Sequence, residues 1–235
     1  MSTTTQSLSP QRIPLSRERV LGCALVLADE SGIAGLTIRS LAASMGTKPM
    51  SLYHYVANKE EILDGIVDAV FSEIDPPSPA GEWRKEMHER AHSVRQALKR
   101  HPWAVGLLET RTSPGPATLR HHEATLATLR AAGFSVQMTA HAYALLDSYI
   151  YGAALQEAAL PFHGPDAAAE VTASIVELFS QGQYPHLVEI ATEHVLKAGY
   201  DFGDEFDFGL NVILDGLARA IPGPGTDAGD QPAGM

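Results

Sequence analysis

Cysteine is almost absent from this sequence, since Cys23 is the only one among 235 residues. A disulfide framework is therefore excluded, and a reducing compartment fits the composition. The chain also lacks any uninterrupted apolar run of the roughly 20 residues that a membrane helix needs. Residues 1–14 contain no apolar core of a signal peptide. We therefore expect a cytoplasmic protein with no membrane partner.

Positive charge is scarce as well: 17 lysines and arginines stand against 28 aspartates and glutamates, and the net charge is −11. The deficit is uneven along the chain. Residues 1–60 hold six basic and four acidic side chains, a balance of +2, so the remainder carries −13. This asymmetry indicates that only the N-terminal part meets an anion such as DNA.

Alternating β-branched runs are missing too, and helical periodicity takes their place, which predicts an all-α fold. The segment DPPSPAGE at 75–82 marks a domain boundary. We expect disordered tails at 1–14 and 222–235, a small domain with a connecting helix at 15–74, and a larger helical domain at 80–221. Helices are predicted over 16–31, 37–45, from Pro49, from an Asn58–Glu61 capping box, and near 82–100, 116–132, 135–158, 166–181, 186–198 and 204–220.

The spacing of the first 60 residues is the strongest functional signal. Two short helices meet at a tight turn through Gly46, and a longer helix precedes them. This is the plan of a helix-turn-helix, in which the second short helix enters the major groove of DNA. A plain helical hairpin is the alternative that spacing alone leaves open.

The same stretch resembles the DNA-binding domain of the TetR family of bacterial transcriptional regulators. The matching pieces are G-x-x-G-L-T-x-R-x-L-A at 32–42, M-G at 45–46, LYHYV at 52–56 and NKEEIL at 58–63. The resemblance implies a three-helix DNA-binding domain joined by a fourth helix to a larger effector-binding and dimerisation domain. It places DNA contacts at Thr37, Arg39, Lys48, Pro49, Met50, Ser51, Tyr53, His54, Tyr55 and Lys59.

Two of these positions also bear on helix capping. Thr37 is suited to cap the second helix as well as to touch DNA. Many members of the family have a serine where this chain has Lys48, so a capping oxygen is lost and a phosphate contact is gained. Leu52 and Val56 read as core residues rather than as DNA contacts.

The C-terminal half resembles, more loosely, the effector domain of the tetracycline repressor, through LLETRTSPGPATL, LRAAGFS and HAYALLDSYIYGAALQE. That repressor holds a magnesium ion through a histidine, and Leu107 stands at the matching place here. We therefore expect an apolar or aromatic effector rather than a tetracycline–metal complex, and no cofactor. The candidate effector-binding residues are Trp103, Leu107, Arg111, Tyr143, Asp147 and Tyr151.

The resemblance also implies a homodimer in which the last helix and a long central helix form a four-helix bundle with the partner. An apolar stripe on the last helix agrees, although a helix central in its own domain would show the same stripe. The residues predicted for the dimer interface are Tyr149, Gly152, Phe206, Leu210, Ile213 and Leu217.

The segment HERAH at 88–92 matches the H-E-x-x-H pattern of zinc proteases. Helical geometry places His88 and His92 on one side, which we expect to be the polar side, and the sequence offers no evident third ligand. The metzincin continuation is broken at Arg95 and Leu98. His121 and His122 are also expected at the surface, where adjacent histidines make a poor chelate.

The sequence therefore predicts a ligand-responsive transcriptional regulator without catalytic residues, most simply a repressor released from a palindromic DNA operator by a small molecule. Two alternatives stay open: a zinc-dependent hydrolase using His88, Glu89 and His92, and a helical ligand-binding protein without DNA binding. A regulatory metal at His88 and His92 is a third, looser possibility.

Overall fold

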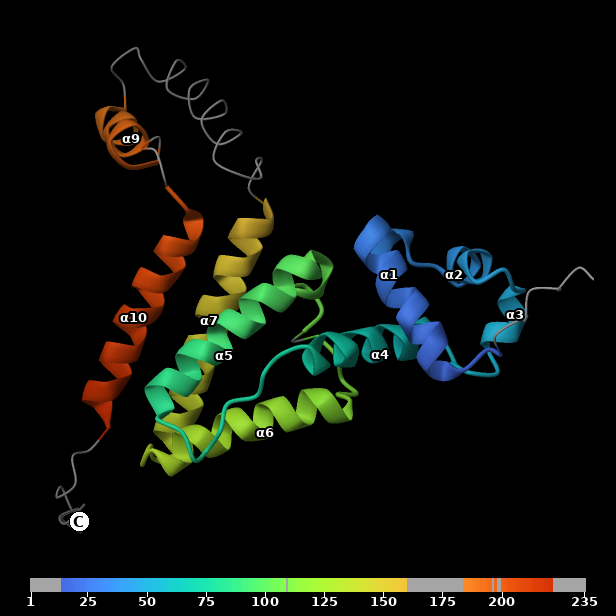
Figure 1. Ribbon diagram of the computed structural model, residues 1–235, viewed down its shortest axis with the longest axis horizontal. Coiled ribbons are helices and arrows are strands. Elements are labelled where there is room, and N and C mark those ends of the chain that lie inside the picture. Colours follow the sequence, from blue (N-terminus) through green and yellow to red (C-terminus); the bar gives the residue numbers. More distant parts are fainter. Residues whose placement is uncertain (1–13, 109, 160–183, 196, 198–199, 222–235) are drawn as a thin grey trace, which may run out of the picture.

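The computed structural model describes residues 14–108, 110–159, 184–195, 197 and 200–221, and every regular element among them is helical (Figure 1). The all-α prediction is confirmed. The helix predicted at 166–181 and both predicted tails, apart from Pro14, lie outside the described residues. The elements are α1 (Arg17–Gly35), α2 (Ile38–Ser44), α3 (Pro49–Leu52), α4 (Lys59–Ser72), α5 (Trp83–Arg100), the 3-10 turn η1 (Pro102–Ala104), α6 (Pro116–Ala131), α7 (Val136–Ala159), α9 (Pro185–Ile190), the π-turn η2 (Ala191–Val195) and α10 (Phe202–Ala220).

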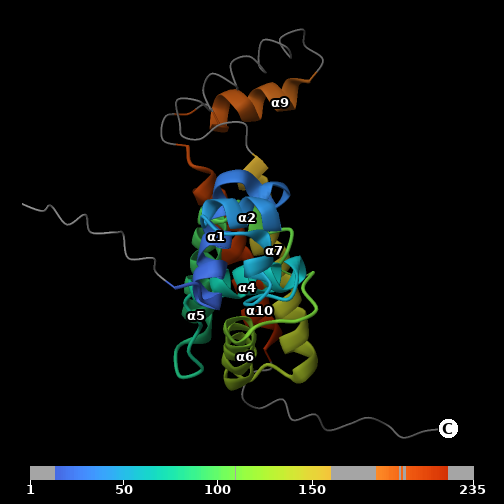
Figure 2. The same cartoon turned by 90° about the vertical axis from the view of Figure 1, so that its right-hand side faces the viewer.

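Helices α1 to α3 form a small unit at one end of the molecule, beyond the first turns of α4 (Figures 1 and 2). Its core is a cluster of buried aliphatic side chains. The members are Val20, Ala24, Ala28, Leu36, Leu41, Ala42, Leu52, Val56, Ile62, Leu63 and Ile66. Leu52 and Val56 belong to this core, as predicted.

The turn between α2 and α3 is fixed by its sequence. Gly46 adopts a φ of 60°, which a residue without a Cβ tolerates most easily. The Gly46 amide donates to the carbonyl of Ala43 at 3.1 Å, and the Thr47 amide donates to that of Ala42 at 2.9 Å. These two bonds are a Schellman motif, so α2 ends sharply and the chain turns at once into α3.

Helix α4 belongs to two cores at once. Its first half supplies Ile62, Leu63 and Ile66 to the cluster around α1 to α3. Its second half supplies Val67, Val70 and Phe71 to the larger cluster of the C-terminal helices. The side chains therefore change from one core to the other within a single helical turn, well before the loop at 75–82.

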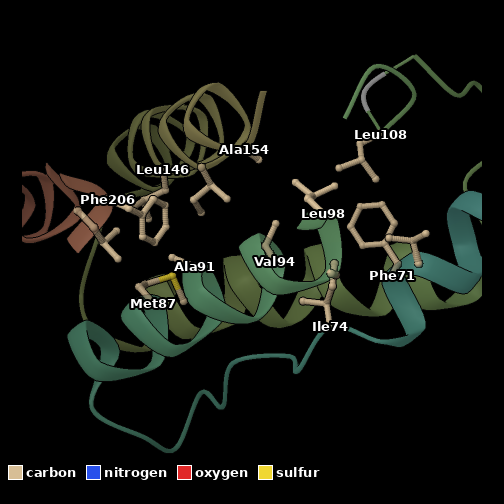
Figure 3. Close-up of a cluster of buried hydrophobic side chains, with 14 of the residues drawn as sticks. Phe71, Ile74, Met87, Ala91, Val94, Leu98, Leu108, Leu146, Ala154 and Phe206 are labelled. Atoms are coloured by element: carbon tan, nitrogen blue, oxygen red, sulfur yellow. The ribbon is translucent and has the colours of Figure 1, made fainter. Parts of the chain in front are cut away.

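The second core lies among α4, α5, α6, α7 and α10 (Figure 3). Met87, Ala91, Val94 and Leu98 form the buried stripe of α5, and Phe206 reaches them from α10. Burying apolar surface of this kind yields roughly 25 cal/mol per Å² and supplies the main driving force for packing the helices. None of the helices in the described part of the chain is long and apolar enough to cross a membrane.

The start of α4 differs in detail from the prediction. Asn58 caps the helix, and its side chain accepts from the Glu61 amide at 2.9 Å. The Glu61 carboxylate, however, accepts from the amide of Ala57 at 2.6 Å rather than from Asn58. The reciprocal half of the predicted capping box is therefore wrong by one residue, because the extended Asn58 backbone brings the preceding amide into reach.

Candidate functional site

The α2–α3 unit presents most of the side chains predicted to contact DNA to solvent. Met50 is 73% exposed and Tyr53 is 46% exposed. Thr37, Arg39, Lys48, Pro49, Met50, Tyr53 and His54 are exposed, and Ser51, Tyr55 and Lys59 are half-buried. Their contacts with DNA stay predictions.

Cations on this unit are available for phosphate. Within the part of the chain that the structure describes, Arg39, Lys48 and Lys59 form no ion pair, whereas the nearby Arg17 is paired with Glu61 at 3.2 Å. Lys59 opens α4 beside its N-terminal amides, which favour anions. Unpaired cations next to a helix N-terminus suit the positioning contacts that proteins make with a DNA backbone.

The caps behave as their residue types predict. Thr37 caps α2, and its side-chain oxygen accepts from the Ser40 amide at 3.0 Å. The Ser40 hydroxyl in turn accepts from the Thr37 amide at 2.9 Å. Lys48 gives α3 no side-chain cap. Where many members of the family have a capping serine, this chain therefore has an exposed cation at the start of α3.

Polar contacts join the small domain to the large one. Asp29 of α1 lies 2.7 Å from His101 Nδ1 and accepts from Trp103 Nε1 at 2.7 Å. His101 also lies 3.2 Å from Glu73 at the end of α4. Burial alone would raise the pKa of Glu73, but hydrogen bonds from Arg100 and His101 lower it. This junction ties α1, α4 and the end of α5 together.

Arg111 makes a second connection to α4. It donates from Nε to Asp64 at 2.6 Å and from Nη2 to Glu60 at 2.7 Å. The hydrogen bond to Glu60 raises the pKa of Arg111 despite its burial. Beside it lies a cleft of about 160 Å³ between α4, Leu108, the loop at 110–115 and α6.

A buried polar triad lies among α5, α6 and α7. Arg90 donates from Nε to His121 Nε2 at 3.0 Å and from Nη2 to Asp147 at 2.6 Å. Burial, and secondly the Arg90 charge, lowers the pKa of His121 from 6.5 to about 3, so the ring is neutral. Since Nε2 accepts, Nδ1 carries the proton. The atoms Arg90 Nη1, His121 Nδ1 and Asp147 Oδ2 are buried without a hydrogen-bond partner among the described residues.

Buried polar atoms are nearly always hydrogen-bonded, so these three atoms call for an explanation. The triad continues toward the cleft, because the ring of His121 lies 6.1 Å from that of His122, which lines it. His122 Nδ1 lies 2.6 Å from the Tyr143 hydroxyl. The side chains of α6 and α7 thus form a polar strip that leads from the cleft into the domain.

The structure divides the six predicted effector residues between two places. Tyr143 and Asp147 belong to the polar strip, and Arg111 borders the cleft. Trp103 is committed to the junction with Asp29, and Leu107 packs against both cores. Tyr151 packs against the large core. Sequence reasoning missed Arg90 and His121, since charged and titratable residues are seldom buried.

Burial bears on part of the predicted dimer interface, whose contacts stay predictions. Phe206, Leu210 and Leu217 are 1%, 0% and 5% exposed within their own chain and pack in its core. Tyr149 is half-buried, with its hydroxyl donating to the Phe206 carbonyl at 2.9 Å. Ile213 packs on the same core, and Gly152 is half-buried. The apolar stripe of α10 packs into the core of its own domain, which is one of the two interpretations that the periodicity allowed.

The expectation that His121 and His122 lie at the surface was wrong. His121 is buried and His122 half-buried, because α6 packs that face against α4 and α5 rather than exposing it. His88 and His92 do leave the core stripe of α5, but α10 covers that side. Their side chains are 36% and 29% exposed, and Asp207 of α10 lies beside both.

Comparison with known proteins gives a consistent result. Residues 75–221 match the family model described as the tetracyclin repressor-like C-terminal domain. The HTH-type transcriptional repressor DrrR1 of Streptomyces coeruleorubidus is 34% identical over 221 residues, covering 88% of this chain and 80% of the relative. The class A tetracycline repressor of Escherichia coli is 31% identical over 208 residues, covering 87% and 91%. ActR of Streptomyces coelicolor, solved in complex with actinorhodin, has a TM-score of 0.74 at 26% identity, covering 90% and 100%.

A helix-turn-helix unit joined through α4 to a helical domain with a polar cleft defines a ligand-responsive, DNA-binding transcriptional regulator. The chain belongs to the TetR family.

Proposed function

We propose that this chain is a homodimeric repressor that binds a palindromic DNA operator and is released by a small molecule. The observation that carries the DNA part is the α2–α3 unit, where a Schellman turn sets α3 and unpaired cations flank it. Repressors of this class need two recognition helices about one helical turn of DNA apart, which a two-fold dimer supplies.

The outer faces of α7 and α10 supply a surface for dimerisation. Leu145 and Leu155 of α7 are 47% and 59% exposed, and Phe208 and Val212 of α10 are 72% and 56% exposed. These four side chains lie on two helices that pack against each other. Apolar exposure at helical spacing on neighbouring helices favours a four-helix bundle with a second copy.

The effector pocket is proposed between α4, α6 and α7. Its entrance is the cleft beside Arg111, and its inner end is the triad with unpartnered atoms. A cleft of about 160 Å³ is smaller than the roughly 300–1,000 Å³ of typical ligand sites, so binding must move the helices apart. An apolar molecule with one or two carbonyl or hydroxyl groups suits this lining.

This geometry supports a route from effector to DNA. An effector that takes hydrogen bonds from Arg111 competes with Asp64 and Glu60, which fasten that side chain to α4. Because α4 also carries Lys59, a shift of α4 changes the spacing of the two recognition helices. The effector then acts by preferring the state that does not fit the operator.

Selection of bound sequences from a random DNA pool tests the proposal. We expect a palindrome with half-sites about 10 base pairs apart, and binding that weakens steeply with salt. Recovery of no enriched sequence would refute the DNA-binding role. The recovered operator complex can then be challenged with tetracycline and Mg²⁺, which we expect to leave it intact because Leu107 provides no metal ligand.

A further inference from the structure

Three potential metal ligands meet in an open groove between α5 and α10. His88 and His92 lie one turn apart on α5, and Asp207 lies on α10. One ligand atom of each, taken together, lies within 4.8 Å of the others. The groove has a volume of about 400 Å³ and is also lined by Asp75, Glu89, Ser93 and Gln96.

These side chains lie within ion-pair distance but do not form a hydrogen bond. His92 Nε2 lies 2.6 Å from Asp207 Oδ1, and His88 Nε2 lies 3.8 Å from the same oxygen. Yet His92 Nε2 and Asp207 Oδ1 are both buried atoms without a hydrogen-bond partner among the described residues. A divalent cation bound by both atoms would supply the partner that these two shielded electronegative atoms lack.

The two imidazole rings are arranged to share that cation. Their centroids are 4.6 Å apart, and the ring planes meet at 41°. The ring of Phe206 packs edge-on against that of His92, with the two centroids 5.3 Å apart. A single divalent cation satisfies both Nε2 lone pairs and the carboxylate together.

A neighbouring contact shows what an ordinary link between these helices looks like. Arg84 of α5 forms an ion pair with Asp215 of α10 at 2.7 Å and donates a hydrogen bond to Asn211 at 3.3 Å, so this contact is complete without a metal ion. His88 and His92 begin one helical turn further along α5, and no lysine or arginine among the described residues forms an ion pair with Asp207. We propose that His88, His92 and Asp207 bind Zn²⁺ or a similar imidazole-preferring divalent ion, which fastens α10 to α5.

The donor set selects the class of ion. Two imidazole nitrogens and one carboxylate suit Zn²⁺, Co²⁺ or Ni²⁺, whereas Mg²⁺ and Ca²⁺ prefer oxygen ligands. Zinc bonds to nitrogen and oxygen are about 2.0–2.2 Å long, so three ligand atoms within 4.8 Å can converge on one ion after small side-chain rotations. The fourth position faces the groove, where water or Asp75 can complete the tetrahedron.

The site explains the HERAH segment without a peptidase. Glu89 is 59% exposed and lies 3.6 Å from Lys85, so it is engaged at the surface. The third ligand comes from a helix far along the chain and not from the continuation of the same segment. The expected consequence is structural: the ion holds in place the helix whose outer face carries Phe208 and Val212.

Zinc binding to the full-length protein tests this directly. After chelator treatment and dialysis, Zn²⁺ alone is titrated in competition with a zinc-binding dye. We expect one ion per chain, and a loss of affinity of at least about tenfold in Asp207→Asn and in His88→Gln, since even outer-shell changes cost 10–100-fold. His186→Gln, which removes a histidine that is 93% exposed on α9, is the matched control and should bind as the wild type does.

Hydrogen exchange distinguishes zinc that links α10 to α5 from zinc that binds adventitiously elsewhere on the surface. Zinc should slow exchange of the α10 amides in the wild type and in His186→Gln but not in Asp207→Asn, while millimolar Mg²⁺ should have no effect. Circular dichroism confirms that the variants are folded. Equal zinc affinity in the wild type and Asp207→Asn, or no stoichiometric binding by the wild type, would overturn the proposal.

Discussion

Acid should destabilise this protein through a single histidine. In the folded chain, burial and the adjacent Arg90 lower the pKa of His121 from 6.5 to about 3. The groups that face the ring are Arg90, which is held by Asp147, then His122, and the ring of Phe71 at 5.5 Å. None of them offers the protonated imidazole an anionic partner of its own.

The sign of the effect follows from proton linkage. A pKa that is lower in the folded state means that the unfolded chain binds the proton first. The stability is therefore fully present above about pH 6.5 and falls as the pH drops toward 3. One pKa unit corresponds to about 1.4 kcal/mol, so moving from near pH 7.5 to near pH 5 should cost about 2 kcal/mol from His121 alone.

Urea unfolding at the two pH values, at one protein concentration, measures this cost. His121→Gln keeps an acceptor for Arg90 and removes the titrating ring, so it should lose about 2 kcal/mol less than the wild type between the two pH values. His186→Gln should lose as much as the wild type does. If His121→Gln and the wild type lost the same free energy, the assigned burial and protonation of His121 would be incorrect.

Three further predictions concern the DNA face, the dimer and the domain junction. Lys59→Ala should weaken operator binding uniformly and reduce the salt slope by about one, measured by fluorescence anisotropy, whereas Lys85→Ala should change neither. Phe208→Glu should weaken the dimer by at least about tenfold in sedimentation, because burying an unpaired charge is costly, and Leu119→Glu on α6 should not. Asp29→Asn should lower the free energy of unfolding by about 1–2 kcal/mol, because two hydrogen bonds at the junction weaken, while the neighbouring Glu30→Gln should leave it unchanged.

Features set by neighbouring residues could be predicted from the sequence. Thr37, Gly46 and Asn58 each act within a few residues of their own position, so their caps and turn are encoded locally. The same is true of Lys48, whose missing cap follows from its chemistry. For this reason the caps and the turn of the helix-turn-helix unit could be predicted, although α1 runs to Gly35, four residues past its predicted end.

The sites in the large domain depend on contacts between distant parts of the chain. Arginine is usually a surface residue in a helical pattern, and the burial of Arg90 is offset by Asp147 and His121 on two other helices. Asp207 likewise follows His92 by more than a hundred residues, so no local pattern joins them. The apolar stripe of α10 could not by itself reveal whether its own domain or a partner covers it.

The division of α4 between two cores has a practical consequence for protein engineering. A fragment cut at the loop 75–82 would carry Val67, Val70 and Phe71 into water, because their partners lie in the part removed. Such a fragment should aggregate or bind nonspecifically even if its DNA-reading helices are intact. Chimaeras that exchange DNA specificity between relatives should therefore be joined between Ile66 and Val67, so that each half of the helix keeps the core for which its sequence was selected.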